Sequence, residues 1–382
     1  MTRVLGIIGG GQLGMMLTEA AKMMPSHISD VIVLDPTRDC PAAKVGAKQI
    51  VADFKDKDAI IKLSKKSDIL TYEIELGDSN ILKKIEKNAN LNPSAETLGI
   101  IQDKYFQKKF LRENGLPVAD FVSIDSMTDL EEKISRFGYP SLFKARKDAY
   151  DGRGNYKIDG KEELQNAYAQ FERRMMMLEK FVDFKKEVSV IAARNTRGEI
   201  ATYPVVENIH EKNILEMTIA PARVNYQVSE KAAKIAKKTM EVLRGAGVFG
   251  IEMFVTRNDD ILINEIAPRV HNSGHHTLQS SRTSQFEQHL RAILGLELGK
   301  TDLLHYTVMC NVLGPKNFRG RYHPIKFDNT NGVYLKMYQK EESRPQRKLG
   351  HFNVVDTQDT KDVEYLIEKA VKIKNSIKFS DV

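Results

Sequence analysis

Apolar and polar residues follow one another along the first hundred residues as strands and helices do in an α/β protein. Residues 4–8 and 31–35 are short apolar runs, residues 15–24 between them have helical spacing, and residues 69–72 form a later run. Continuous apolar runs of this length are typical of strands that are buried on both faces of a parallel sheet. The pattern predicts a doubly wound α/β unit whose ligands lie at the carboxyl ends of its strands.

The rest of the chain predicts a mixture of α/β and α+β structure in more than one domain. A single helix is expected over residues 95–114, because Gly115 and Pro117 follow it as helix-ending residues. Further helices are expected at 230–244, 284–294 and 361–374, and short C-terminal strands at 308–313, 332–338 and 352–356. The C-terminal part is therefore expected to be small, mixed and rich in β-structure.

Composition places the chain among ordinary globular proteins. Hydrophobic residues make up 41% and charged residues 29% of the 382 residues, which excludes general disorder. No apolar run suits a membrane span, and two distant cysteines, Cys40 and Cys310, exclude a disulfide scaffold. With no signal peptide in the sequence, the expected location is the cytoplasm. The net charge of +7 suits phosphorylated anions better than nucleic acid, because no dense basic block contains interleaved aromatic residues.

A glycine cluster follows the first expected strand. Gly9, Gly11 and Gly14 have the spacing at which backbone N–H groups and a helix N-terminus approach a phosphate. Asp35 stands where an acid could bind a ribose, so the motif alone favours an NAD-dependent oxidoreductase. Glycines needed only for close packing of helix on strand are an alternative, and other phosphates use the same turn.

A second glycine-rich segment, residues 149–154, follows a strand that contains Lys144. Such a loop can fold over a triphosphate, and the lysine supplies positive charge for the phosphates. The lysine precedes the glycines, so the segment is no P-loop, and a simple hairpin turn stays an alternative. Residues 176–182 can offer backbone groups to an adenine, and Glu187 lies either near the ribose or on the surface.

Two apolar strands, residues 250–255 and 261–266, each carry one glutamate. On a hairpin, Glu252, Asn264 and Glu265 can converge on one face. Such oxygen ligands beside a triphosphate suit magnesium, whereas two acids buried without a cation would be costly. The sequence therefore predicts a magnesium site on this hairpin.

Two further polar segments carry candidate chemistry. Residues 267–277 are dense in arginine, histidine, amide and hydroxyl groups, which suit a small planar oxyanion and a developing acyl phosphate. A capped helix from Ser284 would brace this segment. Near the C-terminus, Lys340, Lys348 and residues 344–347 can bind a phosphate monoester, or they form a solvated run of surface charge.

These motifs together resemble those of the N5-carboxyaminoimidazole ribonucleotide synthetases, a family of ATP-grasp enzymes of purine biosynthesis. The similarity runs nearly end to end and is based on segments 9–14, 71–75, 102–104, 150–154, 264–275, 284–287 and 344–351. The segment 264–275 is highly specific, because other ATP-grasp enzymes share its glutamate and often its Pro-Arg pair but not the His-Asn-Ser-Gly-His that follows.

The resemblance implies that ATP, bicarbonate and 5-aminoimidazole ribonucleotide give N5-carboxyaminoimidazole ribonucleotide, ADP and phosphate through carboxyphosphate. It assigns ATP to Lys104, Lys144, Ala149, Tyr150, Asp151, Gly152, Arg153, Gly154, Asn155, Glu179, Lys180, Phe181, Val182, Glu187, His210, Asn264 and Glu265. It assigns Mg²⁺ to Glu252 and Glu265, and catalysis to Arg269, His271, Asn272 and Asp151. The residues assigned to the ribonucleotide and to bicarbonate are Gln12, Leu13, Glu73, Tyr150, Arg269, Ser273, Lys340 and Arg347.

The resemblance also implies a domain organisation and an assembly. A Rossmann-like pre-ATP-grasp domain is expected at residues 1–95, an ATP-grasp region at 96–300 with a nucleotide-clamping lobe at about 118–185, and a C-terminal domain at 301–382. A homodimer without nucleic-acid or membrane partners is the family habit. Three positions depart from the family pattern: Ala149 for a glycine, Lys104 for an arginine and Gln346 for a small residue.

Three other functions stay open on the sequence alone. The first is another ATP-grasp ligase, such as a formate-dependent glycinamide ribonucleotide transformylase. The second is an NAD-dependent oxidoreductase, which leaves the carboxylate hairpin and the segment 269–275 without a role. The third is a non-catalytic nucleotide-binding or nucleic-acid-binding protein, which leaves the acids of the expected metal site unexplained.

Overall fold

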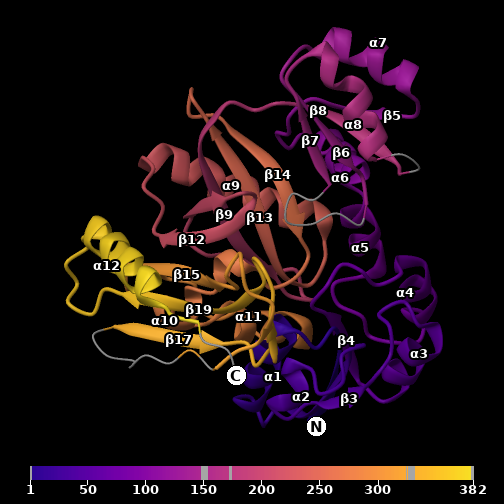
Figure 1. The fold of residues 1–382 in the computed structure, drawn as a ribbon. Coiled ribbons are helices and arrows are strands. Elements are labelled where there is room, and N and C mark those ends of the chain that lie inside the picture. The colour runs from indigo at the N-terminus through magenta and orange to yellow at the C-terminus, as the bar shows by residue number, and fades with distance from the viewer. Residues whose placement is uncertain (1, 148–153, 172–173, 324, 326–331, 380–382) are drawn as a thin grey trace.

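The computed structural model describes residues 2–147, 154–171, 174–323, 325 and 332–379 (Figure 1). Its N-terminal part contains a four-stranded parallel sheet in the order β3-β2-β1-β4. The elements are β1 (Arg3–Ile8), α1 (Gln12–Lys22), β2 (Ile28–Leu34), α2 (Pro41–Lys44), β3 (Lys48–Ile50), α3 (Lys57–Lys65), β4 (Ile69–Tyr72) and α4 (Ser79–Ile85). The predicted α/β unit with parallel strands is confirmed.

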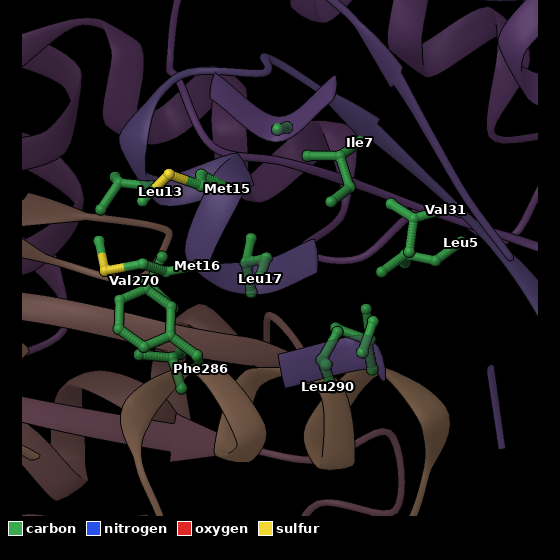
Figure 2. Close-up of a cluster of buried hydrophobic side chains, with 14 of the residues drawn as sticks. Leu5, Ile7, Leu13, Met15, Met16, Leu17, Val31, Val270, Phe286 and Leu290 are labelled. Atoms are coloured by element: carbon green, nitrogen blue, oxygen red, sulfur yellow. The ribbon is translucent and has the colours of Figure 1, made fainter. Parts of the chain in front are cut away.

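An apolar core joins this N-terminal unit to the middle of the chain. Leu13 and Leu17 of α1 lie in one buried cluster with Val270, Phe286 and Leu290 (Figure 2). The last two belong to α11 (Gln285–Leu294), so α1 packs on this helix. The packing holds the carboxyl ends of β1 and β4 close to the segment that follows β14 (Ile261–Ala267).

The single helix expected over residues 95–114 is wrong, because the structure has two helices, α5 (Ala95–Gln102) and α6 (Lys104–Glu113). Asp103 between them is extended, with φ −108° and ψ 109°, and its carboxylate accepts two N–H groups of the first turn of α6. The same carboxylate accepts two hydrogen bonds from the guanidinium of Arg146, at 3.0 and 2.8 Å. These partners stabilise a break that apolar periodicity does not reveal.

A separate lobe contains a four-stranded antiparallel sheet in the order β5-β8-β6-β7, at the top of Figure 1. Its elements are β5 (Phe121–Ile124), α7 (Met127–Phe137), β6 (Ser141–Ala145), β7 (Asn155–Ile158), a 3-10 turn (Lys161–Glu163), α8 (Leu164–Gln170) and β8 (Met176–Lys180). Leu130 of α7, Ala167 of α8 and Phe143 of β6 share one buried cluster, so both helices pack on the sheet.

The large sheet has nine strands, in the order β14-β13-β9-β11-β12-β15-β19-β17 with β10 beside β9. Its strands are β9 (Phe184–Arg194), β10 (Ile200–Thr202), β11 (Val206–Glu211), β12 (Ile214–Ala220), β13 (Gly247–Thr256), β14, β15 (Thr307–Leu313), β17 (Val333–Met337) and β19 (Lys348–Val355). Antiparallel pairing of β12 with β15 means that the C-terminal strands extend the central sheet.

Helices cover this sheet close to where the sequence predicts them. They are α9 (Tyr226–Leu243), α11 and α12 (Val363–Ser376), together with the short α10 (Thr277–Ser280) and a 3-10 turn (Asn272–Gly274). A two-stranded pair, β16 (Gly320–Arg321) and β18 (Glu342–Ser343), completes the described elements. None of the helices in the described ranges has both the length and the apolar character needed to cross a bilayer.

Candidate active site

The two glutamates of the expected magnesium site face each other across β13 and β14. Glu252 pairs with Glu265, and the pairing then skips Asn264, which is an extra residue in β14 and forms a β-bulge. Ile263 and Ile266 both belong to one buried core cluster, although an ordinary strand would direct them to opposite faces. The bulge therefore turns Asn264 and Glu265 together toward the face that Glu252 also occupies.

The two carboxylates differ in their electrostatic surroundings. Burial would raise the pKa of Glu265, but the ammonium of Lys104, 2.8 Å away, and that of Lys144 lower it on balance. Burial raises the pKa of Glu252 to about 7, and the carboxylates of Glu265 and Glu187 act in the same direction. A divalent cation shared by the pair would keep Glu252 ionised.

The donor set fits a magnesium ion that also binds phosphate oxygens. Magnesium prefers oxygen ligands and typically uses one or two carboxylates together with water and substrate phosphates. In the part of the chain that the structure describes, no group of three or more His, Cys, Asp or Glu side chains is placed to hold a metal ion by itself. The pair of glutamates is therefore suited to a metal that arrives with a nucleotide.

A buried carboxylate joins two lysines beside this pair. Glu179 of β8 lies 2.6 Å from Nζ of Lys108 and 2.5 Å from Nζ of Lys144. Burial alone would raise the pKa of Glu179, but these two ammonium groups lower it to about 2. Lys144 is thus held in a fixed position, and a phosphate that reaches it meets a preorganised cation.

Lys108 is a site residue that the sequence reasoning missed. Besides its ion pair with Glu179, its Nζ donates to the backbone carbonyl of Asn264, 3.2 Å away. It therefore links the small lobe to the bulge that orients Glu265. The available signal was its spacing of four residues from Lys104 on α6, because such residues share one face of a helix.

A second ion pair lies on the large sheet near Glu252. Nδ1 of His210 in β11 is 3.0 Å from Oε2 of Glu187 in β9. Burial would lower the pKa of His210, but its hydrogen bond to Glu187 raises it. The charges of both side chains affect the pKa of Glu252, so both lie near the pair of glutamates, Glu252 and Glu265. Residues 180–182 leave the end of β8 toward β9, which places their backbone next to Glu179.

Arg269 and His271 follow β14 and are held from different sides. Nε of Arg269 lies 2.8 Å from Oε1 of Glu75, which follows β4 in the N-terminal unit. The backbone of His271 exchanges two hydrogen bonds with the side chain of Gln285, at 2.8 and 2.7 Å. The His271 ring also packs against Gly250, where a Cβ atom would lie 2.5 Å from it. Burial and then Arg269 lower the pKa of His271 well below its usual range, so the ring is neutral.

Asn272 and Ser273 are held by the large sheet. The side chains of Asn272 and Asn311 exchange two hydrogen bonds, at 3.0 and 2.8 Å. Ser273 is completely buried, and its Oγ lies 2.9 Å from Nδ1 of His271. The resemblance assigns Ser273 to substrate binding, and in this structure its buried side chain contacts the His271 ring.

The first glycine cluster binds a carboxylate of the protein itself. Glu73, which follows β4, accepts the N–H groups of Gly11 at 2.5 Å and Gly14 at 2.9 Å, and Asp35 accepts that of Gly10 at 2.9 Å. Burial raises the pKa of Glu73 to about 7. The N–H groups that would hold a dinucleotide pyrophosphate are thus occupied, which contradicts the NAD interpretation.

The C-terminal basic cluster lies beside this carboxylate. Burial, and next the charge of Arg347, lower the pKa of Lys340 to about 7, whereas Glu73 acts in the opposite direction. Nζ of Lys340 donates to the carbonyl of Lys348, and Arg347 donates to the carbonyl of Glu342, each at 2.7 Å. Two cations held this close repel each other, so a bound anion would restore the charge of Lys340.

Two neighbouring positions have a conformational explanation. Gln12 and Leu13 begin α1, but the side chain of Leu13 is part of the apolar core, so only its backbone can contact a ligand (Figure 2). Gln346 has a φ of 64°, in the left-handed region that favours glycine. A glycine would adopt this conformation without strain, which fits the glycine that the resemblance implies as one of the small residues expected there.

Electrostatic influence connects these groups into one site. Arg269 affects the pKa of Glu73, Glu265 affects that of Arg269, and Lys104 and Lys144 affect that of Glu265. The N-terminal unit, the small lobe and the large sheet therefore contribute side chains to one candidate site.

Part of the expected phosphate loop lies outside the described residues, namely Ala149, Tyr150, Asp151, Gly152 and Arg153. The carbonyl of Gly154 accepts the N–H of Ala145 at 2.8 Å. Asn155 pairs with Lys144 across β6 and β7. The far end of the loop is thus fixed next to Lys144.

Three protein families match consecutive parts of the chain. The ribonucleotide synthetase preATP-grasp domain matches residues 1–102, the ATP-grasp domain matches 109–286, and the phosphoribosylaminoimidazole carboxylase C-terminal domain matches 307–364. The fold and the site are those of the ATP-grasp class.

Relatives that match nearly the whole of this chain identify a family within the ATP-grasp class. The N5-carboxyaminoimidazole ribonucleotide synthase of Bacillus subtilis (strain 168) is 38% identical over 371 residues, which cover 96% of this chain and 95% of the relative. The phosphoribosylaminoimidazole carboxylase of Ogataea methanolica is 40% identical, over 98% of this chain and 70% of the relative. The chain belongs to the N5-carboxyaminoimidazole ribonucleotide synthetase family.

Solved structures of this family have the same fold as this chain. The N5-carboxyaminoimidazole ribonucleotide synthetase of Thermotoga maritima has a TM-score of 0.89 and 45% identity, and all of both chains is covered. The N5-carboxyaminoimidazole synthase of Aspergillus clavatus, solved in complex with ADP and 5-aminoimidazole ribonucleotide, has a TM-score of 0.88 and 30% identity. That comparison covers 98% of this chain and 99% of the other.

Proposed function

We propose that this chain carboxylates 5-aminoimidazole ribonucleotide to N5-carboxyaminoimidazole ribonucleotide at the expense of ATP, with bicarbonate as the source of carbon. The observation that carries this proposal is the position of Glu252 and Glu265 on one face of a bulged hairpin, beside Lys104 and within the electrostatic reach of Lys144. The names of the relatives and the ADP and ribonucleotide complex of the Aspergillus clavatus enzyme support the same reaction.

The first half of the reaction uses the nucleotide side of the site. Glu252 and Glu265 would hold Mg²⁺, which supplies positive charge to the phosphates when it is bound. Lys104 and Lys144 bind the phosphate oxygens. Bicarbonate is a poor electrophile, so one of its oxygens first attacks the γ-phosphorus, and ADP leaves as carboxyphosphate forms.

The loop after β14 positions the carbonate. Arg269, held by Glu75 at 2.8 Å, presents a planar guanidinium to a planar oxyanion. His271 and Asn272 complete the polar surroundings, and donors fixed in place stabilise charge as it develops on carboxyphosphate.

The second half of the reaction needs the ribonucleotide. Lys340 and Arg347 would bind its 5′-phosphate, and Glu73 lies beside them on the N-terminal unit. The substrate amine attacks the carbon of carboxyphosphate, or CO₂ released from it; phosphate leaves with the bridging oxygen, and the amine loses one proton. Close placement of the reactants is essential, since water would otherwise hydrolyse the intermediate.

We further propose that the enzyme works as a homodimer in the cytoplasm. Cys40 and Cys310 are free and buried thiols, which suits a reducing compartment. Light scattering of the purified chain tests the dimer, and a mass near 43.3 kDa would contradict it.

One assay with matched substrates tests the proposed reaction. Phosphate release from ATP should require both bicarbonate and 5-aminoimidazole ribonucleotide, and neither alone should be sufficient. Formate with glycinamide ribonucleotide is the matched control for the rival ATP-grasp ligase. Phosphate release with that pair, and none with bicarbonate, would refute the proposal.

A further inference from the structure

A buried chain of polar side chains leads through the large sheet to His271. Thr218 Oγ1 donates to Asn208 Oδ1 at 3.1 Å, and Asn208 Nδ2 donates to Ser189 Oγ at 2.9 Å. Ser189 Oγ donates to Ser273 Oγ at 2.8 Å, and Ser273 Oγ lies 2.9 Å from Nδ1 of His271. Each of these four supporting residues is buried, so none meets a substrate directly.

In this network of polar side chains, each group donates its hydrogen bond to the next group nearer to the His271 ring. A hydroxyl has one proton, so Ser273, which accepts the proton of Ser189, donates its own proton to Nδ1 of His271. The backbone N–H of Ser273 faces the same nitrogen at 3.4 Å. A backbone N–H is always a donor. The evidence that Nδ1 accepts therefore does not depend on which way the Asn208 amide is turned. Nδ1 of His271 therefore accepts and carries no proton.

The other ring nitrogen faces an acceptor. Nε2 of His271 lies 3.4 Å from Oε1 of Glu252. An imidazole that accepts hydrogen bonds at Nδ1 carries its single proton on the other nitrogen, Nε2.

We propose that Ser273, Ser189 and Asn208 are positioning residues that hold His271 as the Nε2–H tautomer, so that its ring donates a hydrogen bond to the reacting anion. The identity of that anion, bicarbonate or carboxyphosphate, rests on the proposed function. An Nε2–H group stabilises negative charge on a carbonate oxygen and cannot remove a proton there. His271 is therefore not the base that accepts the proton of the substrate amine, and another group must do so.

Nitrogen NMR of the ring tests the tautomer without any substrate or metal. The full chain is labelled with ¹⁵N in its histidine rings, and the His271 signals are identified by their loss in His271→Asn. We expect one pair of signals, with the proton on Nε2, in the wild type, and a larger fraction of the Nδ1–H tautomer in Ser273→Ala, where only the longer backbone contact to Nδ1 is left. A proton on Nδ1 of wild-type His271, or an equal mixture, would overturn the proposal. Because no reaction is involved, this result is independent of the proposed function.

Kinetics with a matched serine tests the consequence for catalysis. Ser273→Ala should lower kcat about tenfold and leave the KM for ATP unchanged, because the lost bond acts on the carbonate side. Ser280→Ala is the control, since Ser280 and His276 form a similar buried pair, 2.7 Å from Oγ to Nδ1, in α10. Its kcat should stay at the wild-type value. An unchanged kcat in Ser273→Ala, or an equal loss in Ser280→Ala, would contradict a specific positioning role.

Substitutions at Ser189 separate the hydrogen bond from packing. Ser189→Thr keeps a hydroxyl and should retain more activity than Ser189→Ala if the directed bond to Ser273 matters. The reverse order would count against the network. A wild-type enzyme that fails to release phosphate with bicarbonate and the ribonucleotide would refute the proposed function alone, and the tautomer would still be decided by NMR.

Discussion

Glu265 is paired with an ammonium group, Lys104 at 2.8 Å, whereas Glu252 faces the neutral ring of His271. The pair therefore combines one carboxylate whose pKa is lowered with one whose pKa is about 7 and that a bound cation would keep ionised. This asymmetry suits a site that binds its metal together with a nucleotide. If protein cations neutralised both carboxylates, the pair would have no negative charge left to attract a metal ion.

Glu265→Gln should weaken the binding of a divalent ion and lower kcat at least about 100-fold, because one of two carboxylate ligands is lost. Electron paramagnetic resonance of Mn²⁺ in the presence of ADP measures the binding directly. Glu241→Gln, on the exposed surface of α9, is the control and should behave as wild type. Wild-type Mn²⁺ affinity in Glu265→Gln would remove this residue from the metal site.

Glu73 predicts a pH dependence of stability. Its pKa is about 7 in the folded protein and near 4.5 when unfolded, so its contribution is fully present below pH 4.5 and is lost as the pH rises to about 7. Because of Glu73 alone, the free energy of unfolding of the ligand-free protein should fall by up to about 3 kcal/mol as the pH rises through this window. Urea unfolding at pH 5 and pH 8 should show a smaller fall in Glu73→Gln, because glutamine does not ionise. Equal falls in variant and wild type would contradict this assignment.

Prediction of single site residues from sequence was strongest where several polar residues of the site lie in one short motif. The segment 264–275 contains Glu265, Arg269 and His271 close together in the sequence. The ion pair between Lys108 and Glu179 could not be predicted in this way, because it depends on how α6 meets the small lobe. The same is true of Asn208 and Ser189, which strand pairing brings below His271.

At the level of elements, the site depends on interruptions in regular structure. The bulge at Asn264 lets two consecutive side chains face the same way, and strict alternation would have directed one of them into the core. The break at Asp103 starts a new helix, so that Lys104 and Lys108 lie on its first turns. Periodicity predicts helices and strands but not the points where they are interrupted, because those depend on tertiary partners such as Arg146.

Gly250 tests how tightly β13 and the loop after β14 fit together. A Cβ atom at this position would lie 2.5 Å from the His271 side chain, so Gly250→Ala should displace the ring and lower bicarbonate-dependent turnover about tenfold or more. Gly99→Ala is the control, because its Cβ would have ordinary contacts in α5. That variant should keep its activity and gain roughly 0.5–1 kcal/mol of stability from helix propensity. Wild-type turnover in Gly250→Ala would show that the ring position is not critical.

For the whole molecule, the important feature is that the candidate site is built from four parts of the chain. Glu73 and Glu75 come from the N-terminal unit, Lys144 and Glu179 from the small lobe, Glu252 and Glu265 from the large sheet, and Lys340 from the C-terminal region. The sequence predicted this fold class correctly, since the strand and helix periods are strong in each part. It did not predict that β15 would continue the central sheet, because pairing with β12 is a long-range contact with no local signal.

The most direct test of the whole account follows an oxygen atom. Bicarbonate labelled with ¹⁸O is supplied with ATP and 5-aminoimidazole ribonucleotide, and the released phosphate is analysed by mass spectrometry. If a bicarbonate oxygen attacks the γ-phosphorus, each phosphate formed with product contains one ¹⁸O atom from bicarbonate. Phosphate without the label, formed at the same rate as the carboxylated product, would mean that ATP does not activate bicarbonate in this enzyme.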